Sequence, residues 1–256
     1  MDAIKNTFKH ALQAGTPQIG LWAAMADPYV TEILATAGFD WLLLDNEHAP
    51  NDVRTTLAQL QALAAYPTAA VVRPVRGDTA VIKRYLDIGA QTLLVPMVDT
   101  AEQAAQVVAA TRYPPRGVRG VGSSLARASR WNATPNYLGT ASDEICVLVQ
   151  AESVTAIGNL AAIARADGVD GVFFGPSDLS ASMGLIGQAG APAVRKAVGD
   201  GIRSVRAAGK AAGVLTSDPE LVKEYRAAGA TFVAVGTDIG LLRKSTTQLL
   251  ASYRGK

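Results

Sequence analysis

The 256-residue sequence has one cysteine, two histidines and no long apolar run. The lone Cys146 excludes an internal disulfide, and its apolar neighbours predict a buried side chain. No segment approaches the roughly 20 apolar residues of a membrane span, and the N-terminus lacks the basic and apolar parts of a signal peptide. The net charge of +2 argues against a polyanion such as nucleic acid as a partner. We therefore expect a cytoplasmic protein with neither a nucleic-acid nor a membrane partner.

The sequence does contain a regular alternation of strand-like and helix-like segments. The strand-like runs are 19–25, 41–45, 70–73, 92–96, 145–149, 171–174, 212–215 and 231–235. The helix-period segments are 2–14 (capped by Asp2), 28–37, 51–64, 78–88, 101–111, 153–165, 191–208, 218–228 and 238–253. Eight such units with mostly short connections predict a (β/α)8 TIM barrel in one domain, 1–256, with an additional N-terminal helix. A doubly wound open sheet is the alternative, which the absence of a glycine-rich dinucleotide fingerprint disfavours.

The carboxyl ends of the strands carry the candidate active-site residues, because barrels of this kind build their active sites there. The run at 41–45 ends in Asp45-Asn46-Glu47-His48, which supplies two acids and a candidate general base. The other histidine, His10, falls on the polar face of the first helix, where no catalytic role is expected. The remaining strand ends contribute Trp22, Arg73, Gln150, Glu152, Ser177, Asp178 and Leu215.

Glu152 and Asp178 follow adjacent strands, so their carboxylates can converge. Two oxygen ligands without a nearby histidine or cysteine suit Mg²⁺, Mn²⁺ or Co²⁺ with open coordination positions. A closed structural zinc site is excluded by ligand type, and Zn²⁺ in an open site is kept as a further candidate. The alternative is that each acid only stabilises the first turn of a helix.

Two further charged residues need partners. Arg73 ends an otherwise apolar strand, and a buried arginine requires an anion, either an internal acid or a substrate oxyanion. Asp87 lies at a helix C-terminus, where an acid opposes the helix dipole, so it needs a specific partner, and a histidine is one candidate.

The positions of the lysines argue against a Schiff-base mechanism. Every lysine falls in a helix, before a strand or at the terminus, so no lysine is placed to form a Schiff base in the barrel mouth. The long connection 112–142 holds five arginines and no acid. This segment serves either anion binding or a subunit interface, and the residues leave both readings open.

Several motifs resemble the HpcH/HpaI family of class II pyruvate aldolases, in order and over almost the whole chain. They are Asp45-Asn46-Glu47-His48-Ala49-Pro50, Val72-Arg73-Pro74, Leu94-Val95-Pro96-Met97, Arg112-Tyr113-Pro114-Pro115-Arg116-Gly117-Val118-Arg119-Gly120, Gln150-Ala151-Glu152 and Phe174-Gly175-Pro176-Ser177-Asp178-Leu179-Ser180. The member type that they resemble most is 4-hydroxy-2-oxoheptanedioate aldolase. Aldolases of 2-keto-3-deoxy sugar acids come next.

The resemblance implies a metal-dependent, reversible cleavage of a 4-hydroxy-2-keto acid to pyruvate and an aldehyde, such as succinate semialdehyde. It implies these roles: metal binding by Glu152 and Asp178, base catalysis by His48 with help from Asp45 or Asp87, enolate stabilisation by Arg73, and substrate contact by Trp22, Gln150, Ser177 and Leu215. It also implies a homo-hexamer that exchanges helix 238–253 between subunits.

Two residues depart from the family pattern, and two other functions stay open. Asn46 stands where glycine is expected and Ser177 where alanine is common, so we expect both to affect substrate preference. An acyl-CoA lyase of the same superfamily is one alternative function. A non-catalytic, anion-binding barrel is the other.

Overall fold

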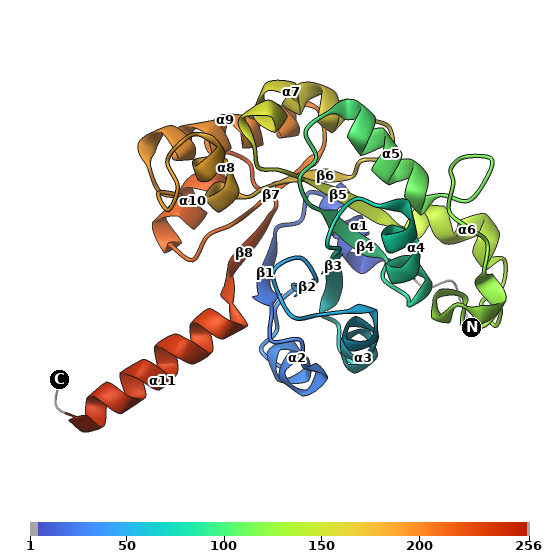
Figure 1. Ribbon diagram of the computed structural model, residues 1–256, viewed down its shortest axis with the longest axis horizontal. Helices are drawn as coiled ribbons and strands as arrows, with labels where there is room; N and C mark the ends of the chain where they lie inside the picture. The colour runs from blue at the N-terminus through green and yellow to red at the C-terminus, as the bar shows by residue number, and fades with distance from the viewer. Residues whose placement is uncertain (1–4, 255–256) are drawn as a thin grey trace.

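A computed structural model describes residues 5–254, in which eight parallel strands close into a barrel in the order β1 to β8 (Figure 1). The strands are β1 Gln18–Ala23, β2 Trp41–Asp45, β3 Ala69–Arg73, β4 Thr92–Val95, β5 Cys146–Ala151, β6 Gly171–Phe174, β7 Ala211–Leu215 and β8 Phe232–Thr237. The predicted TIM barrel is therefore confirmed, and each strand lies within two residues of its predicted bounds.

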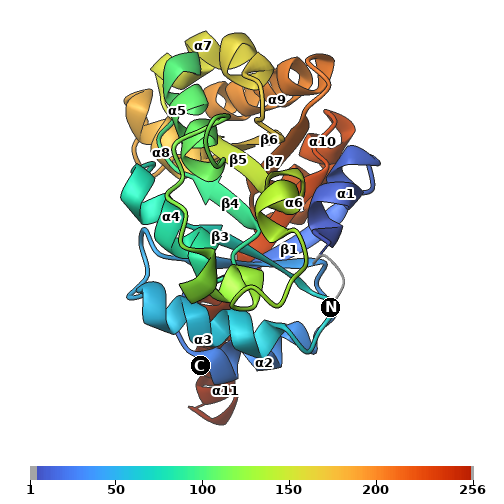
Figure 2. The same cartoon turned by 90° about the vertical axis from the view of Figure 1, so that its right-hand side faces the viewer.

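Helices surround the barrel (Figure 2). They are α1 Thr7–Gln13, α2 Pro28–Ala35, α3 Val53–Leu63, α4 Thr79–Asp87, α5 Ala101–Thr111, α6 Tyr137–Glu144, α7 Val154–Arg165, α8 Pro176–Ser182, α9 Pro192–Ala207, α10 Pro219–Ala227 and α11 Asp238–Arg254. Nine of these coincide with the predicted helix-period segments. Helix α8 lies at Gly175-Pro176-Ser177-Asp178-Leu179-Ser180, where the sequence indicates a strand-to-turn-to-helix segment, and α6 was not predicted. No helix in the described part of the chain combines the length and apolar character that crossing a bilayer requires.

Side-chain alternation along β2 divides the core into two layers. Trp41 and Leu43 belong to the cluster inside the barrel, and Leu42 and Leu44 to the layer between strands and helices. All four are fully buried, which explains the continuous apolar run of the sequence. The next inward position is Asp45, so the strand periodicity itself aims this carboxylate into the barrel mouth.

Helix α1 closes the amino end of the barrel. Phe8 packs against the rings of Trp41 and Phe232, with centroid separations of 5.8 and 5.9 Å. The helix begins at Thr7 and its cap is Asn6, whose side chain accepts the Lys9 N–H. A start at residue 2 is therefore wrong, since an asparagine nearer the first buried residue satisfies the free N–H groups. The predicted cap Asp2 lies outside the described residues.

The long connection 112–142 is ordered and returns towards the amino end of the barrel. It contains two 3-10 turns, Ser123–Leu125 and Arg127–Ser129, and leads into α6. Arg119 anchors it, with no exposed surface, by stacking its guanidinium 4.6 Å from the ring centre of Tyr113. Cys146 is buried, as predicted.

Helix α11 leaves the barrel and extends away from it (Figures 1 and 2). Its first residue, Asp238, is buried and accepts the backbone N–H groups of Ala24 and Met25, which ties the helix start to the end of β1. Beyond that point the helix exposes a series of large apolar side chains, namely Ile239, Leu241, Leu242, Leu249, Leu250 and Tyr253.

Candidate active site

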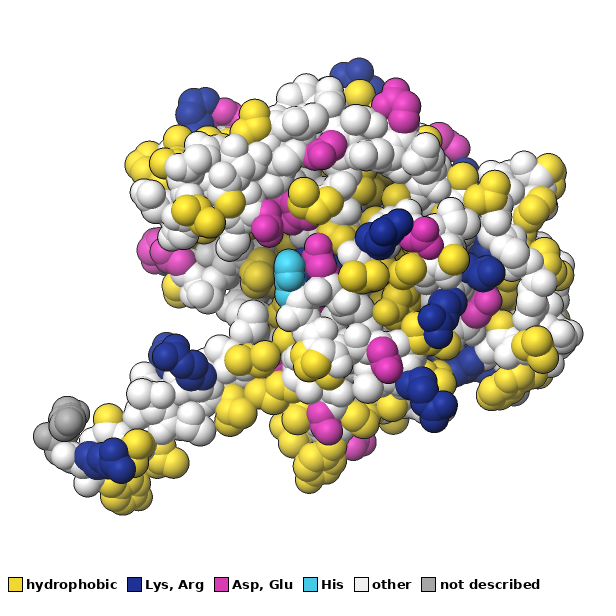
Figure 3. Space-filling view, viewed as in Figure 1, with side chains coloured by type: hydrophobic (Ala, Val, Ile, Leu, Met, Phe, Trp, Pro, Cys, Tyr) yellow, Lys and Arg dark blue, Asp and Glu magenta, His cyan; other side chains and the backbone are white. Residues whose placement is uncertain are grey.

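A cavity of about 730 Å³ opens at the carboxyl ends of the strands. Figure 3 shows this hollow with a histidine and acidic side chains at its rim. Eight of the predicted site residues line it: Trp22, His48, Arg73, Gln150, Glu152, Ser177, Asp178 and Leu215. The strand-end argument therefore identified one continuous site.

Arg73 is the centre of the polar network, with 6% of its surface exposed. It donates to both oxygens of Asp45, from Nε at 2.9 Å and from Nη2 at 2.7 Å, and its guanidinium carbon lies 5.1 Å from the ring centre of Trp22. Burial alone would raise the pKa of Asp45, but this two-pronged bond outweighs it and the pKa falls below its ordinary value. Arg73 thus has its internal acid, and its guanidinium is held rigidly at the cavity wall.

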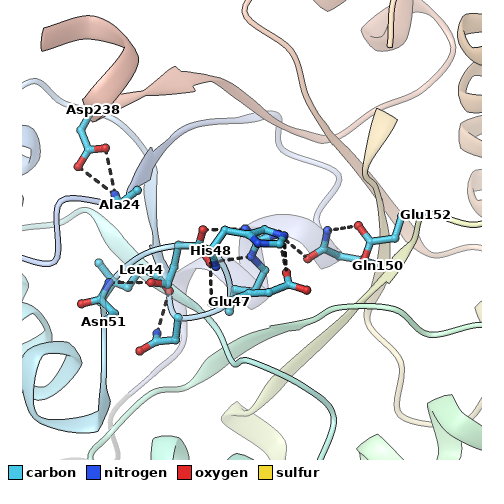
Figure 4. Close-up of polar contacts among 11 residues, drawn as sticks. Ala24, Leu44, Glu47, His48, Asn51, Gln150, Glu152 and Asp238 are labelled. Atoms are coloured by element: carbon cyan, nitrogen blue, oxygen red, sulfur yellow. Dashed lines mark hydrogen bonds and ion pairs between the residues drawn. The ribbon is translucent and has the colours of Figure 1, made fainter. Parts of the chain in front are cut away.

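The turn after β2 folds around the same carboxylate. Asp45 accepts the backbone N–H groups of Glu47 at 3.0 Å and His48 at 3.4 Å, so it fixes the turn that carries the histidine. The His48 side chain is 66% exposed and its Nε2 lies 3.8 Å from the Glu47 carboxylate. Figure 4 shows the two side chains next to each other. Asp45 therefore positions His48 through the backbone, and does not bond the imidazole. Asn46 points away from the cavity, since its side-chain oxygen accepts the hydroxyl of Thr56 at 2.7 Å.

Gln150 connects Arg73 to Glu152. Its side-chain oxygen accepts Arg73 Nη1 at 3.3 Å and its amide donates to Glu152 at 2.9 Å (Figure 4). The other oxygen of Glu152 accepts the backbone N–H of Met97 at 2.8 Å. Met97 adopts a left-handed conformation with φ 54°, which is strained for a non-glycine residue and directs this N–H inwards.

Glu152 has the most perturbed carboxyl group of the cavity. Burial is the largest cause, the Met97 N–H opposes it, and the nearby charges of Glu47 and Asp178 add to it, so the pKa rises to about 7. The pKa of Glu47 is also raised, mainly by burial, although Arg73 lies 2.9 Å away. The cavity therefore gathers more negative charge than its arginine compensates.

A divalent cation fits this donor set. Glu152 and Asp178 are hard oxygen donors, and Asp178 reaches the cavity from the first turn of α8. Gly175 keeps space beside them, because a Cβ there would lie 2.4 Å from Glu152 Oε2. No cluster of three or more acids, histidines or cysteines suited to a metal occurs within residues 5–254. Two protein carboxylates with open positions are thus the arrangement that the chain offers.

Asp87 and His48 are not brought together within the chain. Asp87 ends α4, at the amino end of the barrel, and accepts Arg119 Nη2 at 2.9 Å. A direct contact with the histidine of the same chain is therefore wrong, since the partner of Asp87 here is an arginine from the connection 112–142. His10 likewise has a partner, the Glu144 carboxylate, 3.1 Å from Nε2.

Three further residues belong to the cavity or contact its polar network without a role predicted from the sequence. Met97 occurs only within a family motif, yet its backbone N–H bonds Glu152, and Glu47 contacts both Arg73 and His48. Lys244 also lines the outer cavity, from α11 and not from a strand. A backbone donor such as Met97 leaves no side-chain signal in a sequence, whereas the acid beside the candidate base was visible.

The model of the family described as HpcH/HpaI aldolase/citrate lyase matches residues 18–245, from β1 into α11. The chain belongs to this family. A hydroxypyruvate/pyruvate aldolase from Paraburkholderia phytofirmans is 70% identical over 97% of this chain and 93% of its own length. A 4-hydroxy-2-oxo-heptane-1,7-dioate aldolase from Salmonella heidelberg is 57% identical over 98% of this chain and 95% of its own length.

The solved structures agree with the sequence relatives. An HpcH/HpaI family protein from Burkholderia cenocepacia superposes with a TM-score of 0.94 at 38% identity, covering 98% of this chain and all of the other. Together with the strand-end cavity, these likenesses establish the protein as an enzyme, a class II aldolase of the carbon–carbon lyase type.

Proposed function

We propose that the enzyme reversibly cleaves 4-hydroxy-2-keto acids, among them 4-hydroxy-2-oxoheptanedioate, to an aldehyde and either pyruvate or hydroxypyruvate. The arrangement of Arg73, Gln150 and Glu152 around one cavity carries this proposal. The names of the relatives support it. Relatives called hydroxypyruvate/pyruvate aldolase share 58 to 70% identity with the chain, and a heptanedioate aldolase shares 57%, so both donor acids are proposed.

The substrate is held by fixed donors. Arg73 uses Nε and one N–H of Nη2 on Asp45, which leaves a second Nη2 N–H for the 2-keto oxygen or the carboxylate of the substrate. Trp22, stacked on the guanidinium, and Leu215 form apolar walls. We propose that Ser177, which lines the cavity at the start of α8, donates to the carboxylate of the substrate. This is the position at which we propose that the chain adjusts its preference for pyruvate or hydroxypyruvate.

The bond cleavage needs a base and an electron sink. His48 takes the proton of the 4-hydroxyl group, the C3–C4 bond breaks to release the aldehyde, and its electron pair forms the enolate of the keto acid. Arg73 faces the developing negative charge on the C2 oxygen, and protonation at C3 completes the product acid. Glu152 and Asp178 would hold a divalent cation, for which we propose Mg²⁺, Mn²⁺ or Co²⁺ with Zn²⁺ as a further candidate, and its positive charge would help to stabilise the enolate.

The test is hydrogen exchange at pyruvate in D₂O. The enzyme with Mg²⁺ is expected to exchange the methyl protons of pyruvate, which is measured as the loss of their NMR signal, and chelation of the metal is expected to stop the exchange. The variant His48→Ala is expected to lose 4-hydroxyl proton transfer and thus aldol cleavage by about 10²- to 10⁴-fold. Absence of exchange with each of the four metals would contradict the proposal.

We further propose that the active form is a homo-hexamer in which α11 is exchanged between subunits. The exposed apolar side chains of α11, including Leu241, Leu249 and Tyr253, support it, because such a row on a protruding helix requires a covering surface. In this assembly Asp87, which does not reach His48 of its own chain, is proposed to support the histidine of another copy, and the connection 112–142 lies near the contact.

Mixing two inactive variants tests this arrangement. Hexamers assembled from His48→Ala and Asp87→Asn chains combine intact histidines with intact aspartates, so a fraction of the activity is expected to return after co-refolding. No recovery, with hexamers confirmed by light scattering, would contradict the shared site. A monomer in light scattering would contradict the exchange of α11.

A further inference from the structure

A second cavity of about 330 Å³ lies at the opposite end of the barrel, between the strands and the connection 112–142. Its floor includes the amino ends of β3, β4 and β5, at Ala69, Thr92 and Ile145. It shares no lining residue with the catalytic cavity among the described residues. We call it the basal cavity, and its contents cannot be the reacting substrate.

The basal cavity contains uncompensated positive charge. Arg127 donates to the backbone oxygens of Ile88 at 2.9 Å and Leu60 at 3.4 Å. Burial lowers its pKa, the neighbouring Arg130 lowers it further, and no acid within residues 5–254 offsets either effect. A guanidinium has five N–H groups, so donors of Arg127 remain available for an anion.

The acid that lines the cavity is already engaged. The Glu144 carboxylate accepts the backbone N–H of Asn6 at 2.7 Å and lies 3.1 Å from Nε2 of His10. Its charge is thus directed at the start of α1 and not at the arginines. Leaving two arginines without an acid costs stability unless an anion completes the site.

A buried hydroxyl also points to a missing ligand. Thr134 is 95% buried, since 5% of its surface is exposed, and its hydroxyl has no hydrogen-bond partner. Buried polar groups are paired in the large majority of cases, so an unpaired hydroxyl in the wall of a cavity indicates an acceptor that binds there. Thr134 and the arginines come from the same connection.

The backbone around the cavity is specialised to hold these groups. Gly89 has φ +102°, and a Cβ there would lie 2.6 Å from Nη1 of Arg127, so the guanidinium fits because this residue is glycine. Arg130, Trp131 and Asn132 adopt three consecutive left-handed conformations, with φ 53°, 55° and 67°. Such conformations are unfavourable for non-glycine residues and persist where the surroundings enforce them, often at binding sites.

The rest of the lining is mixed: polar residues such as Asn6, Thr68 and Thr140 stand beside an apolar part formed by Leu60, Leu63, Tyr66, Ala128 and Ile145. We propose that the basal cavity binds a small organic carboxylate with a hydrocarbon body, its carboxylate held by Arg127, Arg130 and the Thr134 hydroxyl. A free phosphate would leave the apolar walls uncovered, and a neutral apolar molecule would leave both arginines uncompensated. The apolar part of the wall and the two arginines together favour an amphipathic anion.

Isothermal titration calorimetry on the full-length protein with three probes tests the ligand class. Hexanoate combines charge and hydrocarbon, hexan-1-ol has the hydrocarbon alone, and inorganic phosphate has the charge alone. We expect one hexanoate per chain and at least roughly tenfold weaker binding of the other two. Saturating pyruvate and a divalent metal are expected to leave hexanoate binding unchanged, because the catalytic cavity is separate.

Two variants and a matched control locate the site. Arg130→Asn removes a charge while asparagine tolerates the left-handed conformation, and Thr134→Val removes the hydroxyl at nearly constant volume. We expect hexanoate affinity to fall roughly tenfold in Arg130→Asn and roughly fivefold in Thr134→Val. Arg116→Asn, an exposed arginine of the same connection that does not line the cavity, is expected to change it less than twofold.

Several results would overturn the proposal. These are no hexanoate binding, equal binding of phosphate or hexan-1-ol, displacement of hexanoate by pyruvate, and an equal loss in the Arg116→Asn control. Aldol cleavage measured without hexanoate serves as the folding check, since neither Arg130 nor Thr134 belongs to the catalytic cavity.

Discussion

The two ends of the barrel carry opposite charge imbalances. At the carboxyl ends of the strands, Glu47, Glu152 and Asp178 crowd around one arginine, and the pKa of Glu152 rises to about 7. At the amino ends, Arg127 is half-buried beside Arg130 and its pKa falls. Burial weakens whichever charge is in excess, so each end favours a ligand of the opposite sign. The comparison shows how one barrel can hold two sites of opposite charge. Acids follow the carboxyl ends of the strands, and arginines lie in the connection that precedes a strand.

The largest expected effect concerns Arg73 at the carboxyl end. We expect Arg73→Lys to lower kcat/KM by about 10³-fold, because a lysine cannot bond both oxygens of Asp45 and also reach Gln150. Steady-state kinetics of aldol cleavage measures the loss, with circular dichroism as the folding control. Activity within tenfold of the parent would show that a point charge suffices there.

An acid-to-amide change at the amino end is expected to destabilise the protein. Asp87→Asn leaves the fully buried Arg119 without its carboxylate, which we expect to cost about 3 kcal/mol of unfolding free energy. Urea denaturation at pH 7 measures it. The companion variant Arg119→Met should cost less, because the Asp87 side chain is 29% exposed and water can solvate it. The reverse order would contradict this account of the pair.

The same type of change at the carboxyl end is expected to have the opposite sign. In metal-free protein, Glu152 has a folded pKa of about 7 against an ordinary value of 4.5, so ionising it in the folded state costs stability. This cost is absent when the pH is below the ordinary pKa of 4.5, and it is complete when the pH is above the raised pKa of about 7. Glu152→Gln should therefore raise the unfolding free energy by roughly 1–2 kcal/mol at pH 8 and by much less at pH 5.

Metal serves as the control for that variant. Adding Mg²⁺ at pH 8 should stabilise the parent and not Glu152→Gln, because the cation binds the ionised carboxylate. Thermal unfolding at both pH values, with chelator and with Mg²⁺, separates the two contributions. An advantage of Glu152→Gln that stays constant between pH 5 and pH 8 would rule out ionisation as its cause.

Much of the site was accessible from the sequence because it depends on local order. Eight strand ends could be read from apolar runs, and the barrel rule then brought Arg73, Gln150 and Glu152 to one mouth. Helix α1 shows the limit of local reading, since Asn6 and not Asp2 is its cap. Side-chain patterns do not reveal the backbone groups of the site. The most important of these is the Met97 N–H, which donates to Glu152.

The sequence by itself determined the barrel, the family and the residues of the catalytic mouth, because strand periodicity and parallel topology place consecutive strand ends together. The tertiary structure alone decided which charges pair. It joined Asp45 to Arg73, and Asp87 to Arg119 and not to His48. It also left the charge of Arg127 without an acid and the Thr134 hydroxyl without a hydrogen-bond partner in a cavity. Charge pairing depends on burial and on the distance between residues that are tens of positions apart in the sequence. A local sequence pattern contains neither quantity.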